Sequence, residues 1–405
     1  MHAAAAEFAE RPPINRLADV AEDKLEQESI KIGHAFMKRW AAAINNVVKD
    51  FHPAYFAMVM ATGIMSIAFD AMAFTGISQA LFRLNLVFYP ILCILLAARV
   101  LLFRPNLTAD LKTLHRSWLF LTFVVGTNTF GMQLIIFQRA TDAACALWLI
   151  ALAGWFICIY FIFFNLIPLR KKPAYEIVNG ATLLTIVSTV SVALLGLRLL
   201  DATAMQSGHA YIAAWAFWAI GFLMYLLIVP IVIYRLFFIR LKPVEWEAPY
   251  WICMGAPAII TLTGSEFVLY MPRMPDTPQL ENIRAMTFSL SILAWIIGTS
   301  WIPYQLIMDI RQFVRINITD SPPLWIKAFP WSRLAFGRRY HFYGPPSWSR
   351  VFPMGMYTAC TLALAKITGF GFLGPTSHYW GWFALLIWFL TLIGMLRSVL
   401  SGQMS

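Results

Sequence analysis

Long apolar runs alternate with short polar connections along most of this chain. From residue 51 onward, ten runs are each about 20 residues long, the length at which an α-helix crosses the hydrocarbon core of a bilayer. They cover residues 53–72, 81–103, 117–137, 142–168, 181–200, 210–234, 249–271, 285–310, 348–370 and 378–400. The pattern predicts an all-α polytopic membrane protein, in which residues 51–405 form one domain of ten transmembrane helices.

Residues 1–50 are polar by comparison and form a separate region in this prediction. Phe36, Trp40, Ile44 and Phe51 recur there at helical spacing, with basic residues between them. This spacing predicts an N-terminal tail with an amphipathic helix. That helix could lie on the inner membrane surface or pack on the cytosolic face of the bundle, and the sequence favours neither arrangement.

Two of the apolar runs are copies of one another. Residues 56–70 (FAMVMATGIMSIAFD) and 352–366 (FPMGMYTACTLALAK) match without a gap and share the pattern Phe-x-Met-x-Met-x-Thr. Transport folds are commonly assembled from repeats of this kind. With Phe56 and Phe352 as position zero, the other odd-numbered segments align with Phe123, Leu183 and Ile252 at zero.

Helical periodicity separates two faces of this repeat. An α-helix turns about 100° per residue, so positions 0, 3, 7, 10 or 11 and 14 share one stripe, and position 6 lies about 120° away. We interpret the stripe as the face toward a pore. The predicted lining residues are Phe56, Phe123, Leu183, Ile252, Phe352, Gly126, Gly255 and Gly355. The threonines at position 6 are Thr62, Thr129, Thr189 and Thr358, and we expect them to make helix contacts and local backbone hydrogen bonds.

Position 14 of the repeat carries an ionisable residue in three copies, namely Asp70, Glu266 and Lys366. An unpaired charge in a spanning helix costs at least ~2.5 kcal/mol, so these residues predict a water-filled vestibule or mutual pairing. Glu266 with Lys366 is the pair that we expect. Alternatively, the three side chains lie near the outer interface and reach water by extending along the helix.

Composition and charge agree with a membrane location. The chain is 60% hydrophobic and only 13% charged, whereas soluble domains carry about 25% charged residues. Most of its 31 Lys and Arg residues fall on the same side of the ten predicted spans. Basic connections stay in the cytoplasm, so we predict that both termini are cytoplasmic. The predicted location is the inner (plasma) membrane.

Several kinds of chemistry lack their sequence motifs. The chain has no HExxH, GxSxG or Walker-type glycine loop, no CxxC pair, and its seven histidines are scattered. We therefore predict no cofactor, no metal, no nucleic-acid partner and no ATP-driven pump. An intramembrane enzyme remains a weak alternative in which Asp70 and Glu266 would form a carboxylate pair.

Two stretches carry a resemblance to a known family. Residues 51–64 (FHPAYFAMVMATGI), residues 348–354 (WSRVFPM) and the ten-helix plan resemble the tellurite-resistance/dicarboxylate transporter family. That family includes bacterial tellurite-resistance proteins, fungal malate and sulfite transporters, and plant slow anion channels. The likeness covers roughly residues 51–400 and leaves out the tail.

The resemblance implies an architecture and a gate. It implies five helical hairpins in a pseudo-fivefold arrangement, with the odd-numbered helices around a central pore and one pore in each subunit of a homotrimer. It also implies passage of small anions such as chloride, nitrate, sulfite or C4-dicarboxylates. Several family members occlude the pore with a Phe on the ninth helix, and Phe352 is the matching residue here.

Together these features predict an anion channel or transporter with a Phe-gated pore. Because Asp70 and Glu266 lie in the predicted vestibule, a proton-coupled C4-dicarboxylate carrier, such as one for malate, is the main alternative. The intramembrane enzyme and a scaffold protein with a vestigial pore are the remaining alternatives.

Overall fold

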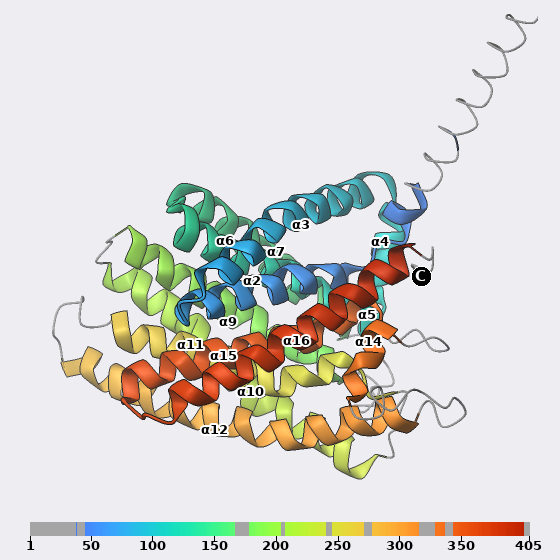
Figure 1. Cartoon of the computed structure of the whole chain (residues 1–405). Helices are drawn as coiled ribbons and strands as arrows, with labels where there is room; N and C mark the ends of the chain where they lie inside the picture. The colour runs from blue at the N-terminus through green and yellow to red at the C-terminus, as the bar shows by residue number, and fades with distance from the viewer. Residues whose placement is uncertain are drawn as a thin grey trace, which may run out of the picture.

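The structure is a bundle of long helices (Figure 1). The computed structural model describes residue 38 and residues 45–166, 178–203, 207–239, 245–270, 278–315, 329–336 and 343–400. Its long helices are α2 (Phe56–Ala71), α3 (Thr75–Leu102), α6 (Leu121–Gln133), α7 (Thr141–Leu166), α9 (Leu184–Ala202), α10 (Gly208–Phe238), α11 (Ile252–Tyr270), α12 (Pro278–Arg315), α15 (Trp348–Thr368) and α16 (Leu373–Leu400). No β-strand occurs among these residues, which confirms the predicted all-α fold. Most of the predicted amphipathic tail helix lies outside the described residues.

Nine of the helices in the described part are long and apolar enough to cross a membrane. The remaining long helix, α15, carries Arg350 near its start and Lys366 near its end. It nevertheless packs along α2 and α11 inside the bundle, and Gly369 ends it in the left-handed conformation that suits a helix C-terminus. We therefore still predict ten spans. Nine of them, among the described residues, are helices long and apolar enough to cross a membrane.

The helices pair into hairpins and then into a ring. Each inner helix packs against the helix that follows it, so that α2 pairs with α3, α6 with α7, α9 with α10, α11 with α12, and α15 with α16. The inner helices also contact one another in a closed cycle in the order α2, α6, α9, α11, α15 and back to α2. The five predicted hairpins are present, and α2 begins at the same end of the bundle at which α16 finishes (Figure 1). Exact pseudo-fivefold symmetry stays a prediction.

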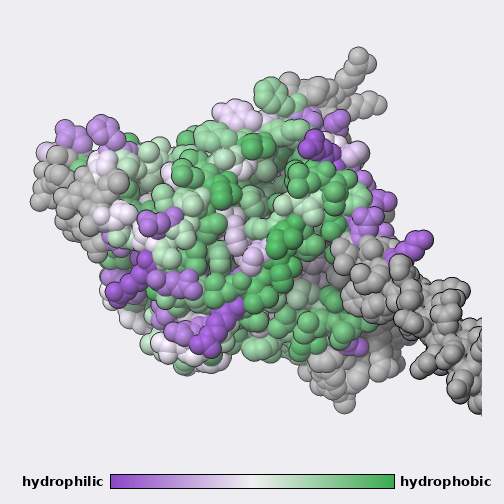
Figure 2. Space-filling view, turned by 90° about the horizontal axis from the view of Figure 1, so that it is seen from above, coloured by the Kyte–Doolittle hydropathy of each residue, from purple (hydrophilic) through white to green (hydrophobic). Residues whose placement is uncertain are grey.

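Burial distinguishes the inner helices from the outer ones. The most apolar window is 78–94% buried in the spans that contain α2, α6, α9 and α11, and 22–39% buried in those of the five outer helices. Figure 2 shows hydrophobic side chains over the middle of one face, with hydrophilic side chains gathered toward the two ends. A helix satisfies its own backbone hydrogen bonds and therefore exposes only side chains to its surroundings. The exposed apolar side chains of the outer helices are the surface that lipid can cover.

A short 3-10 turn leads into each inner helix. These turns are Pro53–Tyr55, Trp118–Phe120, Gly180–Leu183, Ala248–Trp251 and Pro345–Ser347. We call this end of the ring the near end, and the end at which the inner helices finish the far end. Because Phe56 and Trp348 are the first residues after their turns, Phe352 lies one helical turn farther along than Phe56. The repeat alignment, in contrast, puts both residues at position zero and therefore at the same level. Four residues are close to one full helical turn, so the alignment assigns the correct helix face although it misses this difference in level.

The repeated threonines behave as predicted from the sequence. Thr129, Thr189 and Thr358 each donate a hydrogen bond to the carbonyl four residues earlier in their own helix. Thr62 accepts a bond from the indole of Trp388 on α16, and Thr189 accepts one from Trp155 on α7. Thr62 and Thr189 therefore join inner helices to outer helices, as expected for intramembrane threonines.

Outer helices also fix the segments that lead into their inner partners. Arg99 of α3 donates to the carbonyl of Phe51, and Arg235 of α10 donates to that of Val178. Gln312 of α12 and Arg397 of α16 do the same toward Trp246 and Ala335. All four bonds lie at the near end, and those to Phe51, Val178 and Trp246 satisfy carbonyls just before the turn into an inner helix.

Candidate functional site

The far end of the ring is hollow. An axial cavity of about 70 Å³ is lined by residues from all five inner helices, which is room for several water molecules. Its lining residues are Ile67, Ala71, Met132, Leu194, Arg198, Leu262, Glu266, Ala359, Leu362, Ala363 and Lys366. Most of them occupy positions 7, 10, 11 and 14 of the repeat, which belong to the stripe predicted from the sequence.

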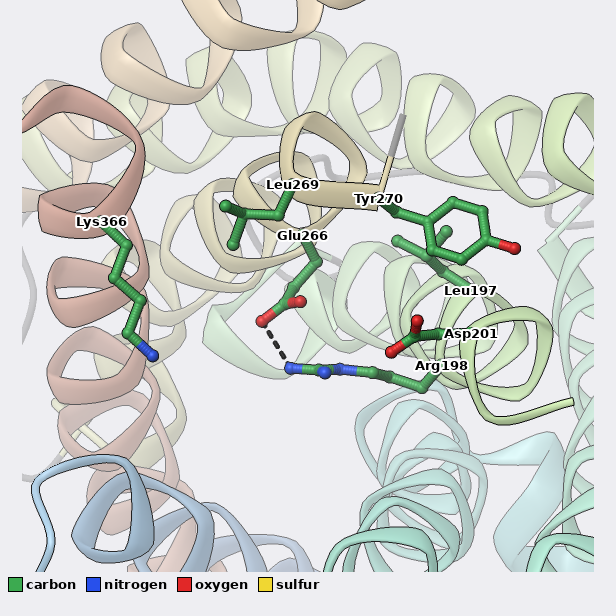
Figure 3. Close-up of a pocket in the computed structure, with 7 residues that line it drawn as sticks. All are labelled: Leu197, Arg198, Asp201, Glu266, Leu269, Tyr270 and Lys366. Atoms are coloured by element: carbon green, nitrogen blue, oxygen red, sulfur yellow. Dashed lines mark hydrogen bonds and ion pairs between the residues drawn. The ribbon is translucent and has the colours of Figure 1, made fainter. Parts of the chain in front are cut away.

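A second, wider cavity of about 210 Å³ lies over the last turns of α9 and α11 (Figure 3). It is lined by Leu197, Arg198, Asp201, Glu266, Leu269, Tyr270 and Lys366. Arg198, Glu266 and Lys366 line both cavities, so this charged trio lies where the outer cavity meets the axial one. Any solute that passed between the two cavities would pass these three side chains.

An ion pair within the trio corrects one sequence prediction. Glu266 pairs with Arg198, whose Nη2 lies 2.6 Å from Glu266 Oε1, and not with Lys366 as expected. The side chains of Arg198 and Glu266 are 32% and 15% exposed, so solvent screens this pair only in part. Sequence analysis missed Arg198, although its place one residue beyond position 14 in the third copy was an available signal.

Lys366 points toward the same opening from the other side. In Figure 3 its side chain extends from α15 into the cavity, facing the Arg198–Glu266 pair. Lys366 is exposed and makes no hydrogen bond or ion pair with any residue in the described ranges. Asp70, the third predicted vestibule charge, is half-buried near the end of α2 and does not belong to the lining of either cavity.

Phe352 lies on the cavity-facing stripe of α15, nearer the start of the helix. Ala359 and Ala363, which line the axial cavity, lie within about 20° of Phe352 around the helix, and Ala359 is about 10 Å farther along it. The opposite face of α15 contacts α16, where Trp380 donates to the carbonyl of Met354. Phe352 is fully buried, so the helix ring has no solvent-accessible space beside its phenyl group.

The residues that follow Phe352 pack closely against neighbouring inner helices. A Cβ atom at Gly255 of α11 would lie 2.8 Å from Pro353 Cγ, and one at Gly355 would lie 2.9 Å from Ile64 Cγ2 of α2. Both glycines therefore let helices of the ring approach closely. Both glycines lie at contacts between inner helices.

The remaining predicted lining residues have different surroundings. The rings of Phe56 and Phe123 meet edge to face at 5.1 Å, and a Cβ atom at Gly154 of α7 would lie 3.3 Å from Phe123. Phe123 is about 180° around α6 from Met132, the residue that α6 contributes to the axial cavity. Leu183 and Ile252 are fully buried at the near end, and Gly126 packs against the backbone of Phe56.

The near end contains a buried charge cluster that sequence analysis did not find. The carboxylate of Asp309 accepts Arg350 Nε at 2.7 Å and the indole N–H groups of three tryptophans. These are Trp246, Trp251 and Trp331. Arg350, two residues before Phe352, is 3% exposed and Asp309 is 0% exposed. Buried charges require this kind of full pairing, and the cluster joins α12 and α15 to two other segments.

Metal chemistry has no donor set in the part of the chain that the structure describes. No group of three or more His, Cys, Asp or Glu residues there could hold a metal ion. The cysteines are free, and Cys253 and Cys360 are buried in helix packing.

Comparison with known proteins gives an independent assignment. The sequence profile of a family described as voltage-dependent anion channel matches residues 50–396. Two uncharacterized transporters of Methanocaldococcus jannaschii are each 21% identical, over 88% and 89% of this chain and 96% and 98% of their own lengths. An uncharacterized membrane protein of Mycobacterium tuberculosis is 28% identical over 44% of this chain and 77% of its own length.

Proposed function

Because the chain belongs to the voltage-dependent anion channel family, we propose that it conducts small anions along the axis of its inner helices. This family is the tellurite-resistance/dicarboxylate transporter family that its sequence resembles. It is a multi-pass membrane protein of a family of channels and transporters. In this proposal Phe352 is the constriction and the charged trio forms the outer vestibule. The anions are inorganic ones such as chloride, nitrate or sulfite, or C4-dicarboxylates.

One observation carries the proposal, which is the axial cavity that all five inner helices line. In this proposal the cavity is the outer half of a permeation path, and the path is closed at Phe352, which is fully buried. Leu183 and Ile252 would line the near-end continuation, whereas Phe123 lies on the opposite face of its helix.

Charge distribution suggests the orientation. The positive-inside rule puts the near end, with most of the basic connections, in the cytoplasm and both termini with it. The net charge of +11 would raise the anion concentration close to that surface. The inner membrane and the homotrimer that the resemblance implies are part of this proposal, and the exposed apolar surface of the outer helices is available to lipid or to neighbouring subunits.

A proton-coupled dicarboxylate carrier is the second candidate, and Glu266 is the observation that favours it. Its carboxylate lies on the axial cavity with a side chain that is 15% exposed. A carboxyl group in such a place could take up a proton as an anion passes. Under this alternative, anion flux would acidify the vesicle lumen.

Purified protein in liposomes tests the proposal. Chloride, nitrate, sulfite and malate are compared with and without a pH gradient, and protein-free liposomes serve as the control. We expect anion flux above the control without a pH gradient. Flux that requires the gradient would favour the carrier, and no flux for any of the four anions would overturn both. Appearance of a chemical product from any anion would instead indicate the enzyme.

A further inference from the structure

The charged trio at the junction of the two cavities has one cation engaged and one free. Arg198 of α9 is bonded to Glu266 of α11, and Lys366 of α15 faces them without a partner among the described residues. Since α11 lies between α9 and α15 in the ring, the carboxylate lies between the two cations. A site with a free ammonium group beside an occupied guanidinium can receive one further anion.

The bond between Arg198 and Glu266 leaves donor capacity unused. Only Nη2 of Arg198 bonds to Glu266, and the buried Nε has no acceptor in the described part of the chain. A guanidinium presents pairs of N–H groups that match two oxygens of a carboxylate, nitrate or sulfite. The carboxylate of Glu266 therefore occupies the position that such an oxyanion would take.

We propose that Arg198 and Lys366 form an oxyanion-binding site at the outer mouth, in which Glu266 competes with the incoming anion for Arg198. The inference rests on the proposed function and names its selectivity site. An oxyanion is attracted first by Lys366, then replaces Glu266 on the guanidinium, and the returning carboxylate displaces the anion toward the axial cavity. The internal competitor keeps binding weak, which a conduction path needs.

The acidic groups near the site set the balance. In the axial cavity Arg198 and Lys366 oppose Glu266 alone, for a formal charge of +1. In the outer cavity Asp201 adds a second carboxylate, so the four charges cancel. Neutralising Glu266 thus leaves a net positive charge at both levels, whereas neutralising Lys366 leaves the axial side with no net charge. The two substitutions are expected to act in opposite directions.

Nitrate uptake into proteoliposomes measures this difference. For Lys366→Gln we expect the half-saturating nitrate concentration to rise about fivefold with little change in maximal flux, because a charge-assisted bond is lost. Lys366→Arg should restore it. For Glu266→Gln we expect the half-saturating concentration to fall about threefold. Arg139→Gln is the control, since Arg139 is exposed near the end of α6 but lines neither cavity.

Two outcomes would overturn the inference. In one, Lys366→Gln behaves like Arg139→Gln, which would mean that only general surface charge matters. In the other, Glu266→Gln weakens nitrate uptake as Lys366→Gln does, which would give Glu266 a supporting role and not a competing one.

A binding measurement separates this inference from the proposed function. Nitrate at constant ionic strength should raise the unfolding temperature of the detergent-solubilised wild-type protein more than that of Lys366→Gln. If wild-type protein passes no anion but shows this difference, the site stands and the conduction proposal fails. If anions pass and the difference is absent, the site fails and conduction stands.

Discussion

The two ends of the inner ring handle charge in opposite ways. At the near end, Asp309 and Arg350 are almost completely buried and every strong bond available to the carboxylate is taken. At the far end, Arg198 and Glu266 are partly exposed beside two cavities, and Lys366 is free among the described residues. Charge that is buried without space holds helices together, whereas charge beside space is available to a solute.

Removing the buried carboxylate should have the largest effect on stability. We expect Asp309→Ala to lower the free energy of unfolding by about 3–5 kcal/mol, because Arg350 and three indoles would lose their acceptor. Circular dichroism during thermal unfolding in detergent measures this loss without relying on the tryptophans at the site. Glu281→Ala is the matched control, since that carboxylate is 69% exposed. Equal losses in the two variants would contradict the contrast between the ends.

A second buried pair at the near end makes the contrast depend on pH. Asp110, in the short helix α4 (Arg104–Lys112), bonds to Arg99 at 2.6 Å and to Arg116 at 2.7 Å. Burial acts to raise the pKa of this carboxyl, but the bonds and charges of Arg116 and Arg99 outweigh it and the pKa is lowered. Stability from a lowered pKa is present above the unfolded pKa of about 3.9 and is lost as pH falls through the folded pKa.

Asp110→Asn should therefore cost about 1.5–3 kcal/mol of unfolding free energy at pH 7, the value of hydrogen bonds to a charged group. The difference from wild type should shrink as pH is lowered toward and below about 4. Chemical unfolding at a series of pH values measures it. A difference that stayed constant down to low pH would mean that the pair is not responsible.

Crowding beside Phe352, the proposed constriction, should have a moderate effect on stability and a measurable one on conduction. In Gly255→Ala the new methyl group would overlap Pro353, whose Cγ lies 2.8 Å from that position. We expect a loss of about 1–3 kcal/mol and an altered anion current, because Pro353 follows Phe352 directly. Gly76→Ala is the control, since nothing lies within 4 Å of its Cβ position. If the anion current of Gly255→Ala equalled that of Gly76→Ala, Gly255 would have no influence on the proposed constriction.

The smallest change in stability is expected at the far end. Glu266→Gln should alter the free energy of unfolding by less than about 1 kcal/mol, because the Arg198–Glu266 pair is partly exposed to water. The same thermal unfolding assay measures it. A loss as large as that of Asp309→Ala would show that this pair is structural and would remove the contrast between the two ends.

The apolar pattern predicted every long helix, because lipid imposes the same length and helical form on each span. It placed the ends of the outer helices less well. The pattern predicted residues 285–310, whereas α12 extends over Pro278–Arg315. Polar turns at both ends extend this helix beyond the apolar run, and a hydropathy window does not register them.

The candidate site could be predicted only as far as single helices determine it. Periodicity identified the stripe with Glu266 and Lys366, since both faces of a helix follow from its own sequence. The partner of Glu266 depends on the depth and rotation of α9 against α11, which no local pattern encodes. Asp309 accepts hydrogen bonds from three segments that lie far apart in the sequence, and for the same reason no local pattern pointed to that cluster.

The current carried by Phe352→Ala tests the central proposal most directly. Wild-type protein, Phe352→Ala and Phe267→Ala are compared in planar bilayers under a chloride gradient. Phe267 is the matched control, because it is equally buried but packs edge to face with Tyr211 of an outer helix at 5.3 Å. The proposal predicts a larger, anion-selective current for Phe352→Ala and no increase for Phe267→Ala. An unchanged current in Phe352→Ala, from protein that is folded and inserted, would contradict it.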